Sequence, residues 1–273
     1  MKWVGQAILY LGLYIIWSGT FGQPNARFGG IDWSIAIPFG LLGIAVLAAG
    51  AAITNSAMKK TQEEDDEISR TTLESPNPGT AFSLFLRPFD TTGKLKIEKA
   101  PGNLFSWEQY DRPGIDALER MLADAVADTA RLIGLGTRGD VEFGPGTAGF
   151  VADWKSKVEQ AAQSASYIFV VPSANEGTLW EIGLIKQRGY FAKSVFIMPP
   201  TVPPFKFDGV GEYKEVWKLA RLACRSAHQI ELPIYDSGGC MFLIDGSAVV
   251  RKEPFDGFTP RDVAKAINKL VQK

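Results

Sequence analysis

The chain opens with two long runs of uncharged, mostly apolar residues, Val4–Gly22 and Trp33–Ile53. Each run is close to the ~20 residues that a helix needs to cross a bilayer. The pattern therefore predicts a transmembrane helical hairpin over residues 1–58. The second run also holds small residues that would let two such helices approach closely, among them Gly40, Gly43 and Gly50.

Lysines stand on one side of this predicted hairpin. Lys2 precedes the first run, and Lys59 and Lys60 follow the second, whereas the connecting loop carries one positive and one negative charge. Because basic residues favour the cytoplasmic side, we expect a two-span protein of the cell inner membrane with both termini in the cytoplasm. The alternative is a signal peptide followed by a buried core helix, but the first run lacks a clear small-residue cleavage site.

The rest of the chain has the pattern of a linker and one globular domain. Residues 59–80 change from basic to acidic and end in a Pro/Gly-rich stretch, which favours a solvated linker, with a short helix through 60–70 as an alternative. Residues 81–273 alternate apolar runs with amphipathic stretches. Continuous apolar runs predict four buried strands: Phe82–Leu86, Arg131–Leu135, Tyr167–Val171 and Val195–Met198.

Helical spacing and turn residues complete this pattern. We expect helices from Asp111, over Asp153–Ala165, from Thr178, over Glu212–Ser226 and from Thr259 to Val271. Residues 91–110 and 136–149 read as loops, and Met241–Ile244 with Ala248–Arg251 reads as a late hairpin. The alternation predicts an α/β fold, a flavodoxin-like three-layer domain with a mostly parallel sheet.

Charge and composition exclude several classes of function. The chain has 29 Lys+Arg and 30 Asp+Glu, a net charge of −1, which argues against a nucleic-acid partner bound through bulk positive charge. Only three charged side chains fall in residues 1–58, which separates the apolar part from the globular part. The two cysteines match no metal spacing, and no metal site is expected.

Candidate chemistry gathers where parallel strands end. Ligands of such sheets bind beyond the carboxyl ends of the strands, which here would be followed by Arg87–Asp90, Gly134–Gly149 and Ser173–Glu181. We expect Glu181 in the first turn of a helix, where the helix dipole favours the ionised carboxylate. A carboxylate there can stabilise positive charge at an anomeric carbon during cleavage of an N-glycosidic bond. The alternative is a capping box, in which Thr178 and Glu181 only satisfy amides at the helix start.

The stretch Gly177-Thr-Leu-Trp-Glu-Ile-Gly183 resembles the Gly-Thr-x-x-Glu-x-Gly motif of nucleoside 2-deoxyribosyltransferases, whose glutamate attacks the sugar. It also resembles the related TIR (Toll/interleukin-1 receptor) domains, whose catalytic glutamate cleaves NAD. Leu86-Arg-Pro-Phe-Asp90 is similar to the opening of membrane-anchored bacterial TIR-like proteins. TIR enzymes have a gap between the corresponding tryptophan and glutamate. Trp180 and Glu181 are adjacent here, and this adjacency is closer to the transferase pattern.

This resemblance implies a TIR-like domain over residues 81–273 that binds NAD or a related nucleotide, needs no further cofactor, and forms a homo-oligomer at the lipid bilayer. It implies a signalling or antiviral-defence effector in which Glu181 is catalytic. A non-enzymatic module that senses a nucleotide or self-associates and acts through the hairpin is the alternative. The expected substrate-binding residues are Arg87, Phe89, Asp90, Gly136, Gly144, Gly146, Ser173, Gly177, Thr178 and Trp180.

Several of these residues also have ordinary structural roles. Arg87 either grips a phosphate as a bidentate donor or forms a salt bridge with Asp90. Phe89 either stacks on a base or fills the core. The glycines either let backbone amides approach a phosphate or belong to a mobile loop. Trp180 is either a binding residue or a core residue.

Overall fold

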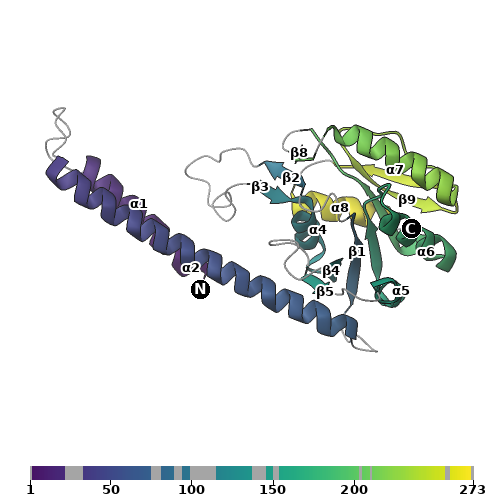
Figure 1. The fold of residues 1–273 in the computed structure, drawn as a ribbon, viewed down its shortest axis with the longest axis horizontal. Coiled ribbons are helices and arrows are strands. Elements are labelled where there is room, and N and C mark those ends of the chain that lie inside the picture. Colours follow the sequence, from purple (N-terminus) through teal and green to yellow (C-terminus); the bar gives the residue numbers. More distant parts are fainter. Residues whose placement is uncertain are drawn as a thin grey trace. The chain divides into compact units, whose positions relative to one another are not determined.

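The computed structural model forms two compact units, Met1–Glu64 and Asp65–Lys273. Each unit is described separately below (Figure 1). The described residues are 2–21, 33–74, 81–88, 94–98, 115–136, 146–149, 154–202, 205–209, 211–255 and 259–271.

The first unit consists of α1 (Lys2–Phe21) and the beginning of α2 (Trp33–Glu74). On α1, the buried residues Gly5 and Gly12 lie against α2. A Cβ on Gly12 would be 2.9 Å from the carbonyl oxygen of Gly43, and a Cβ on Gly50 would be 3.0 Å from that of Gly5. The two helices are therefore antiparallel and in backbone contact, which only glycine allows at these positions.

The buried small residues of both helices follow a seven-residue spacing. They are Gly5, Gly12 and Gly19 on α1 and Ala36, Gly43 and Gly50 on α2, which we call the glycine seam. A seven-residue repeat keeps one face of each helix toward its partner along the whole contact. The close approach expected for Gly43 and Gly50 is confirmed, but Gly40 has nothing within 4 Å of an added Cβ and lies outside the seam.

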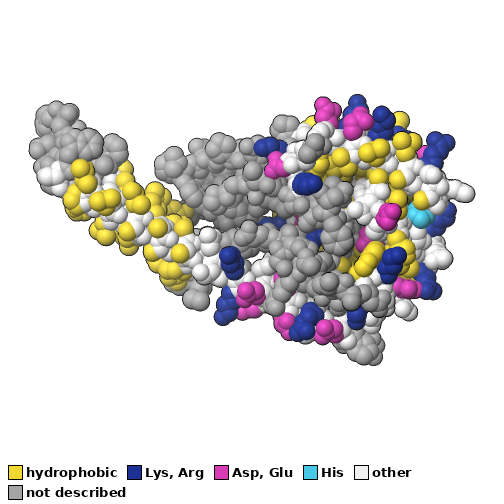
Figure 2. All heavy atoms as spheres, in the orientation of Figure 1, with side chains coloured by type: hydrophobic (Ala, Val, Ile, Leu, Met, Phe, Trp, Pro, Cys, Tyr) yellow, Lys and Arg dark blue, Asp and Glu magenta, His cyan; other side chains and the backbone are white. Residues whose placement is uncertain are grey.

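Large apolar side chains point away from the glycine seam. Leu13, Tyr14 and Trp17 on α1 and Leu41 and Ile44 on α2 are each more than half exposed. Figure 2 shows the described side chains of these helices as largely hydrophobic. This arrangement reverses that of a water-soluble helical pair, which buries its large apolar residues.

Among the described residues, one helix is long and apolar enough to cross a membrane, the segment Ala36–Glu74 of α2. In α1 the apolar stretch is the shorter Val4–Gly19. At 1.5 Å per residue that stretch is about 24 Å long, less than the ~30 Å hydrocarbon core of a bilayer. Length and composition thus support one candidate span rather than the two-span hairpin that the sequence predicts.

The helix α2 continues through most of the predicted linker. Residues 59–74 are helical, so the expectation of extended chain is wrong there and the alternative of a helix through 60–70 is confirmed. Residues 75–80 lie outside the described part. Ser69 is fully buried, Leu73 joins the core of the second unit, and Asp65 forms an ion pair with Arg131 at 2.7 Å. The acidic run is tolerated in a helix because most of its side chains remain exposed to water.

The second unit is built on a sheet of seven described strands in the order β10-β9-β7-β6-β1-β4-β5. The five strands β7, β6, β1, β4 and β5 are parallel, and the hairpin β9–β10 adds to β7 in the antiparallel direction. The strands are β1 (Phe82–Leu86), β4 (Arg131–Gly136), β5 (Gly146–Gly149), β6 (Tyr167–Val170), β7 (Ser194–Met198), β9 (Cys240–Asp245) and β10 (Ala248–Pro254).

Helices cover both faces of this sheet, as predicted for a three-layer α/β fold (Figure 1). On one face α4 packs on β4 and against α8, and on the other face α6 packs against both α5 and α7. The short 3₁₀ helix η2 (Tyr190–Lys193) joins α6 to β7. The helices are α4 (Leu118–Val126), α5 (Trp154–Ser164), α6 (Glu176–Arg188), α7 (Tyr213–His228) and α8 (Pro260–Val271).

A second sheet occupies segments that the sequence predicts otherwise. Strands β2 (Leu95–Glu98), β3 (Ile115–Ala117) and β8 (Phe205–Phe207) form an antiparallel sheet in the order β3-β2-β8. The predicted loop over 91–110 therefore contains β2, the helix expected from Asp111 begins only at Leu118, and the loop over 136–149 ends in β5. These strands have three or four residues, too few for a recognisable hydrophobic period.

The parallel sheet has a switch point between β1 and β6. From β1 the chain proceeds to β4 and β5 on one side, then returns past β1 to β6 and β7 on the other. Numbered along the chain, the five parallel strands thus have the order 3-2-1-4-5, which is that of the classic doubly wound sheet and not the flavodoxin-like 2-1-3-4-5 that the sequence predicts. The hairpin β9–β10 extends the sheet at the β7 edge. Ligands of such sheets bind in the crevice at the carboxyl ends of the strands at the switch point.

Candidate functional site

The helix α6 follows β6 directly and begins beside the switch point. Its N-cap is Asn175, whose side-chain oxygen accepts a hydrogen bond from the Gly177 amide at 2.8 Å. At its other end Gly189, with φ 69°, donates its amide to the carbonyls of Ile185 and Lys186. Two strong caps fix the length and position of α6.

The face of α6 that points into the protein carries two polar residues among apolar ones. Thr178 and Glu181 lie one helical turn apart, and Ile182 and Ile185 continue the same buried face. Glu181 is 6% exposed, and its Oε2 atom has no hydrogen-bond partner in the described part of the chain. A buried carboxyl without a partner costs free energy, so it is a candidate for a functional role.

Burial changes the acidity of this carboxyl. Desolvation raises the pKa of Glu181 to about 8. Because α6 begins at Glu176, Glu181 lies in its second turn and not in the first turn as predicted, where the dipole would favour the ionised form. At pH 7 only about a tenth of the side chains would be ionised in the ligand-free protein, so Glu181 is mainly a proton donor.

The capping-box interpretation of Thr178 and Glu181 is wrong. The cap is Asn175, three residues before Thr178, and Thr178 is already an interior helical residue. The Oε2 atom of Glu181 accepts no hydrogen bond from any described residue. Helix capping therefore does not explain why a carboxyl is buried here. The Ser-Ala-Asn sequence before Glu176 is the signal that could have located the true cap.

The structure brings Arg87 and Ser173 to the same edge of the sheet. Leu86 pairs with Val170, and the Val171 amide donates to the Leu86 carbonyl at 3.0 Å, so the ends of β1 and β6 are adjacent. Arg87 follows β1 directly and is 4% exposed. Ser173 is also buried, and its hydroxyl accepts a hydrogen bond from the Asn175 amide at 2.9 Å.

The glycines predicted to hold a phosphate lie at different levels of the sheet. Gly136 ends β4 and therefore lies at the carboxyl edge, next to the switch point. Gly146 begins β5 and pairs with Ile133, so it lies away from that edge. The structure therefore does not bring Gly146 to the candidate site. Phe89, Asp90 and Gly144 lie outside the described residues.

Trp180 is on the side of α6 that faces α5. The Trp180 ring packs edge-on against Trp154 at a centroid distance of 5.1 Å, and the Lys155 ammonium lies 5.4 Å from the Trp180 ring. Gly177 is partly exposed and close to the same Trp154 ring. Trp180 therefore packs on α5, whereas Gly177 lies four residues before Glu181, one helical turn from it on the same side of α6.

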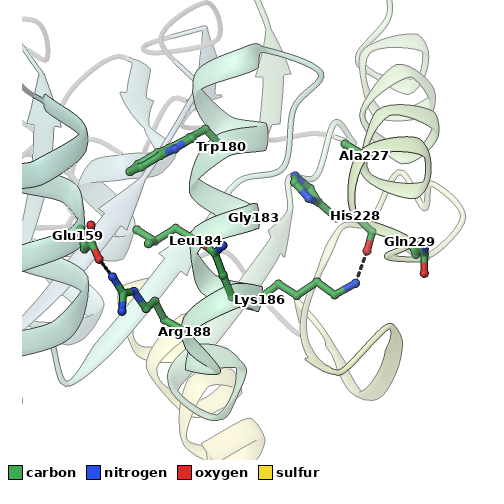
Figure 3. Close-up of a pocket in the computed structure, with 10 residues that line it drawn as sticks. Glu159, Trp180, Gly183, Leu184, Lys186, Arg188, Ala227, His228 and Gln229 are labelled. Atoms are coloured by element: carbon green, nitrogen blue, oxygen red, sulfur yellow. Dashed lines mark hydrogen bonds and ion pairs between the residues drawn. The ribbon is translucent and has the colours of Figure 1, made fainter.

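An open pocket of about 650 Å³ lies on the outer side of α6, between α5, α6 and α7 (Figure 3). Trp180 lines it at one end, and His228 points from α7 toward α6, where its Nε2 is 2.7 Å from the Leu179 carbonyl. A Cβ on Gly183 would be 2.8 Å from the His228 ring. The last glycine of the sequence motif thus permits close packing of α6 on α7.

The charged groups of this outer pocket are largely engaged with protein atoms. Figure 3 shows Arg188 paired with Glu159 and the Lys186 ammonium bonded to the carbonyl of His228. We therefore place the candidate site at the switch point and not in this pocket. Its residues at the carboxyl edge or on the inner face of α6 are Arg87, Gly136, Ser173, Thr178 and Glu181.

Comparison with models of protein families, with curated protein sequences and with solved structures finds no match for this chain. No group of side chains suited to a metal ion occurs in the described part of the sequence. The fold and the site thus define a doubly wound α/β unit with a buried acid beside its switch point. The likeness to TIR domains and deoxyribosyltransferases remains a prediction from sequence motifs.

Proposed function

We propose that this chain is a membrane-anchored nucleotide-binding protein that cleaves an N-glycosidic bond of NAD or a related nucleotide. The observation that carries the proposal is Glu181, a buried carboxyl on the inner face of α6 whose Oε2 atom has no hydrogen-bond partner among the described residues. It lies on the first helix after β6, one of the two strands that form the switch point where ligands of such sheets bind.

The chemistry follows from the acidity of Glu181. In the resting protein the carboxyl is mainly protonated, because burial raises its pKa to about 8. A ligand that brings positive charge to the site would lower that pKa and favour the carboxylate. Positive charge develops at the anomeric carbon in the transition state of cleavage. The ionised carboxylate of Glu181 would form there and stabilise that charge.

The test uses the full chain in detergent or lipid nanodiscs. NAD and a panel of other nucleotides are incubated with the protein at high concentration, and release of the free base is measured. We expect turnover, and we expect Glu181→Gln to reduce it by about 10²- to 10⁴-fold, the range for a lost acid or base. The matched control is Glu176→Gln, an exposed residue of the same helix. Absence of turnover for every nucleotide, or an active Glu181→Gln variant, contradicts the proposal.

The membrane anchor is proposed from the first unit. Its large apolar side chains are exposed and its glycines form the contact, an arrangement suited to lipid and not to water. Because Gly5 packs against Thr54, Lys2 and the Lys59–Lys60 pair lie at the same end of the helical pair. Basic residues at this one end favour a cytoplasmic location for both ends of the pair in the inner membrane, with α2 as the candidate span and the shorter α1 packed against it. We expect the full chain to stay in membranes after alkaline carbonate extraction; release into the supernatant would refute the anchor.

A non-enzymatic role is the second candidate, and the small exposed fraction of Glu181 favours it. A carboxyl that is 6% exposed and mainly neutral at pH 7 can act as a ligand-sensing hydrogen-bond donor without chemistry. In this case the domain would bind a nucleotide or self-associate, and the helical pair would perturb the membrane. Liposome leakage that survives Glu181→Gln favours this candidate, whereas leakage that requires turnover favours the enzyme.

A further inference from the structure

A second pocket, of about 500 Å³, lies at the carboxyl end of β7. Its volume is within the range of small-molecule sites. Three of its lining residues are aromatic and come from three separate segments: Phe207 from β8, Tyr213 from the first turn of α7, and Tyr235 from the segment before β9. The described residues that line it are Thr201, Phe207, Gly211, Glu212, Tyr213, Lys214, Tyr235 and Ser237.

The aromatic rings are held in fixed positions. Phe207 packs edge-on against Tyr213 at 5.2 Å, and Tyr213 packs against Tyr235 at 5.9 Å between ring centroids. The Tyr235 hydroxyl is 2.8 Å from the Thr201 hydroxyl and donates to the Pro199 carbonyl at 3.3 Å. Rigid rings lose little conformational entropy on binding, so this wall is suited to a flat aromatic ligand.

The rim of the pocket offers both hydrogen-bond donors and acceptors. It carries the hydroxyls of Thr201 and Ser237, the carboxylate of Glu212 and the ammonium group of Lys214. The two charges have opposite signs, so the rim favours neither a simple anion nor a simple cation. Donors and acceptors around an aromatic wall match the edge of a heteroaromatic ring such as a nucleobase.

The pocket shares its sheet edge with the candidate site. The strands β6 and β7 pair in parallel up to Val170 and Phe196, so the segments that follow them leave the sheet at the same edge. Ser173 lies in the first of these segments, and Pro199, which accepts the hydrogen bond from Tyr235, lies in the second. Adjacent strands are about 4.8 Å apart, so the two strand ends are neighbours. A sugar is attached directly to its base, so a base in the pocket would have its glycosidic bond directed along this edge.

We infer that this pocket binds the base of a nucleotide ligand whose sugar lies beside Ser173 and Glu181. The inference rests on the proposed function for the position of the sugar and goes beyond it by assigning a base subsite. The aromatic wall provides stacking and the rim hydroxyls provide contacts to the ring edge. Base stacking on an aromatic side chain tolerates different bases, so we expect preference for nucleosides over sugar phosphates.

The test measures equilibrium binding of adenosine, cytidine and ribose 5-phosphate to the full chain in detergent by calorimetry and saturation-transfer NMR. Phe207→Ala removes one ring of the aromatic wall. Ser237→Phe places a large side chain at the exposed rim, where it should block the pocket, and it replaces Phe207→Ala as the test if that variant folds poorly. We expect both variants to weaken nucleoside binding by at least about fivefold, the loss of a stacking contact of ~1 kcal/mol, without affecting ribose 5-phosphate. The control is Leu219→Ala, an exposed residue of α7 outside the pocket.

The outcomes separate this inference from the proposed hydrolase. If Glu181→Gln loses turnover but nucleoside affinity is unchanged in Ser237→Phe, the base subsite is wrong and the hydrolase stands. If no nucleotide is cleaved but nucleoside binding is lost in Ser237→Phe and retained in Glu181→Gln, the subsite stands and the hydrolase is wrong. Nucleosides that bind no better than ribose 5-phosphate contradict the subsite.

Discussion

Replacing Glu181 by Gln is expected to change how the stability of the protein depends on pH. The pKa of this carboxyl is about 8 in the folded chain, against an ordinary value of 4.5. A raised pKa means that the folded state holds its proton more tightly than the unfolded state does. The stabilisation from the neutral carboxyl is fully present below pH 4.5, and it is lost as the pH rises through about 8.

The size of the effect follows from this shift. Between pH 6 and pH 7 the unfolded chain has lost the proton and the folded chain mostly retains it, so the free energy of unfolding falls by about 1.4 kcal/mol per pH unit, and the slope decreases as the pH approaches 8. From pH 6 to pH 9 the loss is about 3 kcal/mol, and the total over the whole range is on the order of 5 kcal/mol. In the Glu181→Gln variant the side chain does not titrate, so this part of the pH dependence disappears.

The measurement is a urea titration of the full chain in mild detergent at pH 6, 7, 8 and 9, followed by near-ultraviolet circular dichroism. The quantity to compare is the difference between wild type and Glu181→Gln, which should grow in favour of the variant by about 3 kcal/mol between pH 6 and pH 9. The amide changes the baseline stability, but a constant offset does not alter this growth. Glu176→Gln on the same helix should show no such trend, since Glu176 is exposed. A constant difference for Glu181→Gln would show that the carboxyl is already ionised in the folded protein.

Three further substitutions or reactions test the packing. Gly43→Ala places a Cβ 2.9 Å from the Gly12 carbonyl oxygen and should speed amide hydrogen exchange in α1. The control Gly40→Ala should not, because a Cβ there has nothing within 4 Å. Equal exchange rates in the two variants would disprove the glycine seam. Gly183→Ala should lower the free energy of unfolding, measured by urea titration, by about 1–3 kcal/mol, because its Cβ meets the His228 ring. Adding His228→Ala to this variant should recover part of that free energy. No recovery would place the strain elsewhere. Both cysteine thiols are buried, with pKa values of about 11 and about 12, so iodoacetamide at pH 8 should leave them unmodified until the chain unfolds.

The regular elements of the α/β unit were largely predictable. Phe82–Leu86, apart from Ser83, and Tyr167–Val170 are apolar runs and form β1 and β6, because strands buried on both faces need mostly apolar residues. The helical parts that were predicted correctly have a clear 3.6-residue period, as α7 and α8 do. The strands β2, β3 and β8 were missed because each is held by its neighbours in a small sheet and not by its own pattern.

The candidate site was only partly predictable. Glu181 and Ser173 were recognised from the motif and from their place after a buried strand, and the structure places both beside the switch point. Gly146 was expected at the same edge, but it begins its strand opposite Ile133, partway along β4 and three residues before the edge. The aromatic residues of the second pocket were not foreseen, since no local pattern links side chains that are close only in the folded protein.

By itself the sequence determined which segments are apolar, which of them are helical or extended, and that an apolar N-terminal part precedes a globular part. These properties follow from residue type and short-range spacing, which act along the chain. The tertiary structure decided the order of the strands, the glycine contact between α1 and α2, and the burial of Glu181 with no described residue bonded to its Oε2 atom. These depend on which distant segments meet, and the acidity of a carboxyl depends on how much water its neighbours leave around it.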